Sequence, residues 1–95
     1  MEEQRASFAD LLARNPGLRA PDLAGDLERV LNHAVQQVDP ATTVRVTLES
    51  DWVAITPSIP PTDAARRRAT IAALYTAKET WFEQWLGEAA HSASD

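Results

Sequence analysis

The sequence predicts a small α+β domain with the element order α-α-β-β-α. Apolar residues recur with helical spacing in three segments. Between the second and third segments, a short stretch alternates strictly between apolar and polar residues, as a strand does. The chain has 95 residues, which is the length of one domain. We therefore expect residues 1–95 to fold as a single domain, with residues 91–95 frayed at its end.

Two helices are predicted in the N-terminal half, over residues 2–14 and residues 22–38. The first has apolar residues at i, i+3 and i+4, namely Phe8, Leu11 and Leu12. The second has a longer stripe of the same period, formed by Leu23, Leu27, Val30, Leu31, Ala34 and Val38. Gly25 lies inside the second helix and weakens it relative to alanine. Each helix is expected to bury its apolar face.

Residues 43–57 predict a β-hairpin whose two strands are joined by a turn at Ser50 and Asp51. The first strand alternates, with Val44, Val46 and Leu48 on one face. A two-residue turn at this position sets the register of the two strands, so that the apolar sides of both strands coincide.

The same register places Trp52 on the other, polar face, opposite Glu49. An aromatic residue on a solvent face is typical of an interface, because it supplies contact area at low entropic cost. The alternative is that the first helix or the N-terminal arm covers Trp52.

A sheet of only two strands is marginal in water and has two open edges. We expect either that another chain extends the sheet or that loops protect its edges. A homodimer that joins two hairpins, or packs two long helices together, would meet this need.

The third predicted helix is the longest and runs over residues 63–89, with Thr62 as its N-cap. Its apolar arc contains Ile71, Leu74, Tyr75, Phe82, Trp85 and Leu86. Trp81 lies at the edge of this arc, and Lys78 falls in its middle. Lys78 can lay its stem on apolar surface and extend its charge to water, pair with an acid, or mark a site.

The residue types argue against several kinds of chemistry. The chain has no cysteine, and its two histidines, His33 and His91, lie outside any metal-binding spacing. It has no glycine-rich phosphate loop and no nucleophile motif. We therefore expect no metal, no cofactor and no catalytic residues, and we predict that the protein is not an enzyme.

The sequence also bears on location. No apolar run approaches the roughly 20 residues that span a bilayer, so no membrane association is expected. The N-terminus is acidic where a secretory signal would be positively charged. We expect a cytoplasmic protein.

The formal net charge of −5 steers the chain towards a basic surface and away from nucleic acid. We predict a small acidic protein–protein interaction module: an adaptor, an accessory subunit or an inhibitor, encoded by a bacterium, a phage or a mobile element, and forming a homodimer. The expected partner-binding residues are two tryptophans and an arginine cluster: Trp52, Trp81, Arg66, Arg67 and Arg68.

Two alternatives remain open. The first is a nucleic-acid-associated regulator that uses Arg45 together with residues 66–68. The second is a small enzyme or ligand-binding domain with a pocket near Lys78.

Overall fold

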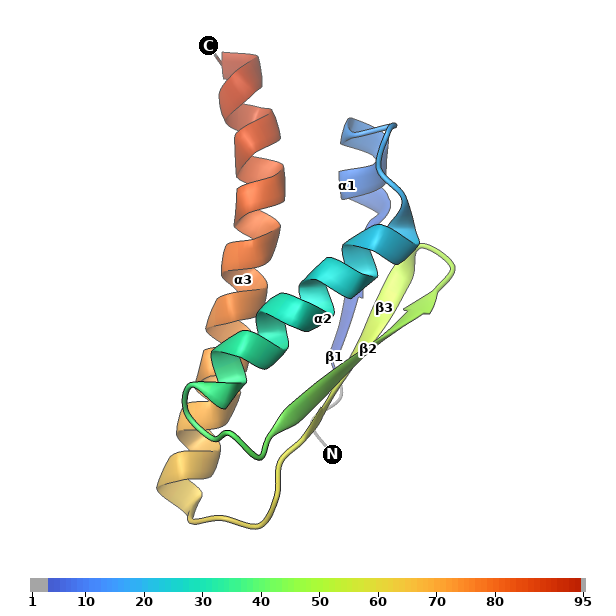
Figure 1. The fold of residues 1–95 in the computed structure, drawn as a ribbon. Helices are drawn as coiled ribbons and strands as arrows, with labels where there is room; N and C mark the ends of the chain where they lie inside the picture. Colours follow the sequence, from blue (N-terminus) through green and yellow to red (C-terminus); the bar gives the residue numbers. More distant parts are fainter. Residues whose placement is uncertain (1–3, 95) are drawn as a thin grey trace.

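A computed structural model describes the backbone of residues 4–94 and the side chains of residues 4–85 (Figure 1). The elements follow the order β1 (Gln4–Ser7), α1 (Ala9–Arg14), α2 (Ala20–Gln36), β2 (Thr43–Glu49), β3 (Trp52–Ser58) and α3 (Ala64–Ser94). The α+β class and the order α-α-β-β-α are confirmed, with one short strand added at the start.

That added strand corrects the first predicted helix. Residues 4–7 are extended, and only Ala9–Arg14 are helical. The backbone N–H of Phe8 donates a 2.7 Å hydrogen bond to the carbonyl oxygen of Asp51, which ties the strand-to-helix junction to the hairpin turn. The helix predicted over residues 2–14 therefore begins seven residues later, at Ala9, because residues 4–7 pair with β3 as a strand.

The sheet has three strands in the order β1-β3-β2, and both pairings are antiparallel. The hairpin register agrees with the sequence prediction, since Leu48 pairs with Val53 and Glu49 pairs with Trp52. Ser50 at the turn has a positive φ of 59°, a conformation that a tight hairpin demands. The chain's own N-terminal segment extends the sheet, in place of the second chain or the loops expected from the sequence.

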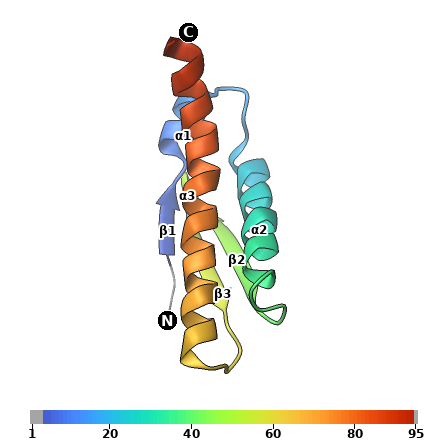
Figure 2. The same ribbon diagram turned by 90° about the vertical axis from the view of Figure 1, so that its left-hand side faces the viewer.

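Helices α2 and α3 lie on the apolar side of the sheet, and α2 sits beside β2 (Figures 1 and 2). The core between them is formed by side chains of α1, α2, α3, β2, β3 and the β1–α1 junction, with Ala6 of β1 packed against it. The largest of its fully buried members are Phe8, Leu11, Leu27, Leu31, Ile55 and Leu74. Within residues 4–94 the helices cover only this side, so the opposite side of the sheet has no helical layer there.

Helix α3 begins one residue after Asp63, whose Oδ1 accepts a 2.8 Å hydrogen bond from the backbone N–H of Arg66. Asp63, rather than the expected Thr62, therefore caps this helix. The helix continues to Ser94, five residues beyond the expected end. The fraying expected for residues 91–95 stays a prediction.

The buried side of α3 is rotated from the predicted arc. Leu74 and Trp81 are its most buried apolar residues, at 1% and 2% exposure, whereas Tyr75 is 45% exposed. The side chain of Leu86 lies outside the described residues. Over residues 4–94, none of the helices combines the length and hydropathy that a bilayer crossing requires.

Candidate interaction surface

The side of the sheet that faces away from the helices is the first candidate for a functional surface. We call it the open sheet face. Its side chains alternate with the buried ones along each strand. They are exposed or half-buried, and comprise Arg5, Ser7, Thr43, Arg45, Thr47, Glu49, Trp52, Ala54 and Thr56.

Among the side chains that the structure describes, Trp52 is the one large aromatic on the open sheet face, where it is half-buried. It pairs with Glu49 on one neighbouring strand and with Ser7 on the other. The guanidinium carbon of Arg5 lies 5.0 Å from the centre of a Trp52 ring, which is a cation–π contact. The N-terminal segment thus flanks Trp52 and contributes one cation, while part of the ring stays accessible.

Carboxylates surround the hairpin end of this face. Both are exposed: Glu49 is the last residue of β2, and Asp51 is the second residue of the turn that precedes Trp52. The hydrogen bond from Phe8 fixes the backbone of Asp51. The hairpin end therefore presents an aromatic ring beside two acidic groups on a fixed backbone.

The outer edge of β2 is closed by polar side chains of α2. The side-chain amide of Asn32 both donates to the carbonyl oxygen of Val44 and accepts from its N–H, each at 2.8 Å. Glu28 Oε1 accepts from the N–H of Val46 at 2.9 Å. These contacts occupy three of the backbone groups along which a further strand would pair.

Gln36 continues the same row one helical turn later, since its Nε2 donates to the carbonyl oxygen of Thr42 at 3.2 Å. Sequence reasoning treats such helix residues as solvent-facing. Their spacing of four residues would have indicated a shared face, but nothing in the sequence places β2 beside that face.

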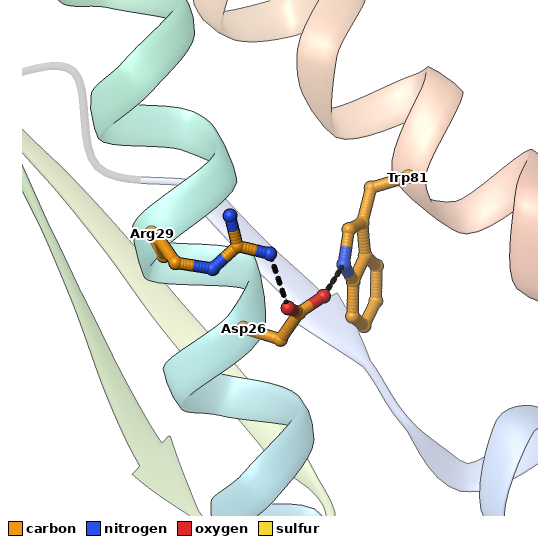
Figure 3. A network of polar contacts seen from close by, with 3 residues as sticks. All are labelled: Asp26, Arg29 and Trp81. Atoms are coloured by element: carbon orange, nitrogen blue, oxygen red, sulfur yellow. Dashed lines mark hydrogen bonds and ion pairs between the residues drawn. The ribbon is translucent and has the colours of Figure 1, made fainter.

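Trp81, expected at a partner contact, lies in the core of the structure. Its Nε1–H donates a 2.8 Å hydrogen bond to Asp26 Oδ2, and Arg29 Nη2 lies 2.7 Å from Asp26 Oδ1 (Figure 3). The bond from Trp81, and then the contacts with Arg29, lower the pKa of the Asp26 carboxyl below its ordinary value. Trp81 therefore joins α3 to α2, and its indole serves the interior.

The three arginines at residues 66–68 are all exposed and lie in the first turns of α3. Successive residues of a helix point about 100° apart, so these side chains do not form one patch. The carbonyl oxygen of Arg66 accepts a 2.8 Å hydrogen bond from Thr70 Oγ1, which is buried. The structure thus separates this cluster from Trp52, which lies on the sheet.

Lys78 lies on the side of α3 that faces β1. Its Nζ donates a 2.8 Å hydrogen bond to Gln4 Oε1 and lies 5.3 Å from the centre of the Tyr75 ring. Lys78 lines neither of two grooves in the protein, one between α2 and α3 and one beside β2. Its observed contacts are those of a residue that fastens the N-terminal strand to α3.

In the described part of the chain, no three histidine, cysteine or acidic residues are grouped so that they could hold a metal ion. Comparison with known proteins adds no relative to this picture. No family model, no curated protein and no solved structure matches the chain. The fold and its surfaces are therefore the basis for any functional conclusion.

Proposed function

We propose that this protein is a small acidic protein–protein interaction module that binds its partner through the open sheet face. The observation that carries the proposal is Trp52, a half-buried aromatic on a three-stranded sheet face that no helix covers. Tryptophan in such a position supplies a large, rigid contact area and is enriched among residues that dominate binding energy.

The charge of the whole chain favours a partner with a basic surface, since the formal net charge is −5. Glu49, which pairs with Trp52, and Asp51 in the turn add acidic groups at the hairpin end, beside the cation of Arg5. Opposite charges across an interface accelerate association and help to select the partner. We propose a role as an adaptor, an accessory subunit or an inhibitor of a larger assembly in the cytoplasm.

The test is a quantitative pull-down from a lysate of the source organism, comparing the wild type with Trp52→Ala. Tyr75→Ala is the matched control, because Tyr75 is an exposed aromatic on α3 rather than on the sheet. We expect one or more proteins with a basic surface to be retained by the wild type and by the control but lost with Trp52→Ala. Equal retention by all three proteins would contradict the proposal.

A second candidate function has one observation in its favour. Arg5 and Arg45 share the open sheet face with Trp52, and a sheet that combines an aromatic with cations can stack and hold single-stranded nucleic acid. The arginines of residues 66–68 lie on α3 and would have to act separately.

Fluorescence anisotropy with a labelled single-stranded oligonucleotide tests this alternative. Binding that weakens steeply as salt rises, and that Arg45→Ala and Trp52→Ala both reduce, would support it. Absence of binding at low salt would remove it.

A further inference from the structure

The ring of Trp52 already carries a cation in the folded chain. The guanidinium carbon of Arg5 lies 5.0 Å from the centre of the ring, and the Arg5 side chain is exposed. The strand pairing brings the two together, because Trp52 lies opposite Ser7, which follows Arg5 on the same face of β1. A cation–π contact at an exposed position is weak, so another cation can take the place of Arg5 on this ring.

Two carboxylates accompany the ring. Glu49 lies opposite Trp52 on β2, and Asp51 precedes Trp52 in the turn. Among the residues that the structure describes, neither of these side chains makes an ion pair or a hydrogen bond. Their negative charges add to the attraction that the face of an indole exerts on a cation. Arg5 brings one positive charge to a place where two negative charges and an aromatic ring favour more.

We propose that the partner places an arginine side chain over Trp52, and that Arg5 is the internal competitor that this side chain displaces. The inference rests on the proposed function, since it names the group with which the partner engages the open sheet face. A guanidinium suits the site better than an ammonium, because its flat face stacks on an indole while its N–H groups bind a carboxylate. Glu49 offers that carboxylate from the neighbouring strand.

The position of Arg5 makes β1 an autoinhibitory element of the binding surface. The partner's arginine has to replace the contact that Arg5 already makes with Trp52. An exposed cation–π contact corresponds to about a two- to fivefold change in a dissociation constant. Removal of the Arg5 guanidinium is therefore expected to strengthen the binding of an incoming arginine by this factor.

Arg45 provides a matched control for the charge of the protein. It is exposed on the same face but lies opposite Thr56, about 13 Å along β2 from Glu49. Arg5→Gln and Arg45→Gln each remove one positive charge, so both make the protein equally more acidic. A difference in affinity between these two variants reports the contact with Trp52 rather than the net charge.

A titration with a short peptide tests the displacement. The probe is acetyl-Gly-Arg-Gly-amide, and the same peptide with citrulline in place of arginine is its uncharged counterpart. The indole N–H signal of Trp52 in a ¹H–¹⁵N spectrum reports binding at the ring and is identified by its loss in Trp52→Phe. We expect the arginine peptide to shift this signal and the citrulline peptide to leave it in place. Arg5→Gln should lower the dissociation constant of the arginine peptide about two- to fivefold, and Arg45→Gln should lower it by less.

Glu49→Gln tests the same site without a change in β1. It keeps the size of the side chain and removes the charge, so the dissociation constant of the arginine peptide should rise. The amide signals of Val53 and Ile55, which pair with β1, show whether that strand keeps its place in Arg5→Gln.

Equal dissociation constants for Arg5→Gln and Arg45→Gln would overturn the proposal. Equal shifts with the two peptides, or no shift of the Trp52 signal with either, would overturn it as well. The proposed function fails on a different result, namely retention of the partner by Trp52→Ala in the pull-down. A partner that is lost with Trp52→Ala, combined with equal affinities of the two arginine variants for the peptide, would leave the proposed function standing and reject only the displacement of Arg5.

Discussion

The indole of Trp81 and the carboxylate of Asp26 form a polar link between the two long helices. Trp81 is 2% exposed, and its Nε1–H donates to Asp26 Oδ2 at 2.8 Å. A buried indole N–H needs such an acceptor, because an unsatisfied donor in the interior is costly. The link therefore lets α3 bury a tryptophan side chain and fixes how α2 and α3 pack.

Replacement of Asp26 by asparagine should make the free energy of unfolding depend less on pH in the acid range. The folded protein lowers the pKa of Asp26, so the charged carboxylate stabilises the fold at neutral pH, and this contribution is lost as the pH falls below about 4. We expect Asp26→Asn to be less stable than the wild type at pH 7 and the difference to narrow at pH 3. Urea unfolding at both pH values measures it. A difference that stays constant with pH would contradict the assignment.

Loss of the Asn32 side chain should weaken the sheet. Asn32→Ala leaves both backbone groups of Val44 without their partner, and each unsatisfied group costs about 1–3 kcal/mol unless water reaches it. We expect a fall in the free energy of unfolding of about 2 kcal/mol and more aggregation through the uncovered edge. Gln36→Ala removes a single 3.2 Å bond to the same strand and should cost less. If both variants lost the same free energy of unfolding, Asn32 would not be the side chain that contributes most to the outer edge of β2.

Thr42→Val should stabilise the protein. Thr42 is fully buried, and its hydroxyl oxygen has no hydrogen-bond partner among the described residues. Valine keeps the shape and removes the unsatisfied group, so we expect a gain of about 1 kcal/mol, or a rise in Tm of about 4–8 °C. Thr70→Val is the control, because the equally buried hydroxyl of Thr70 donates to Arg66 and its loss should bring no gain. Thermal unfolding of both variants measures the two changes in Tm, and an equal change in both would contradict the prediction.

Gly25→Ala should also stabilise the protein. Gly25 is an exposed residue inside α2, and a β-carbon at this position would meet no atom within 4 Å. Alanine is favoured over glycine in a helix interior by about 1 kcal/mol. Gly17→Ala, equally free of steric contacts but outside any helix, should gain less. An unchanged Tm for Gly25→Ala would contradict this prediction.

The hairpin could be predicted from the sequence because its information is local. Strict alternation and a two-residue turn determine which residues face each other, and Leu48 and Val53 pair as predicted. Strand β1 could not be predicted in this way. Its four residues are too few to show a period, and their partner, β3, lies about 48 residues further along the chain. The helical spacing of Phe8, Leu11 and Leu12 instead predicted a helix over residues 2–14, which includes the four residues that form β1.

The candidate surfaces also combine features that follow from local sequence with features that depend on contacts between distant segments. Trp52 on the polar face followed from the register, whereas its cation, Arg5, depends on β1. Alanines occur on several sides of α3, so the spacing of apolar residues alone does not identify which side of the helix is buried. The structure shows that small residues of α3 line the groove beside α2, and that Trp81, at the edge of that groove, is 2% exposed and belongs to the core.

The closed edge of β2 limits how far molecules could add to one another by strand pairing. Growth into a fibre requires every molecule to offer two free edges, one to receive a neighbour and one to be received. Asn32 already occupies both outer backbone groups of Val44, and Glu28 occupies the outer N–H of Val46, so a neighbour that cannot pair here would have to add along β1. Two molecules joined along β1 would each keep β2 as the remaining edge, where the same side chains would oppose the addition of a third.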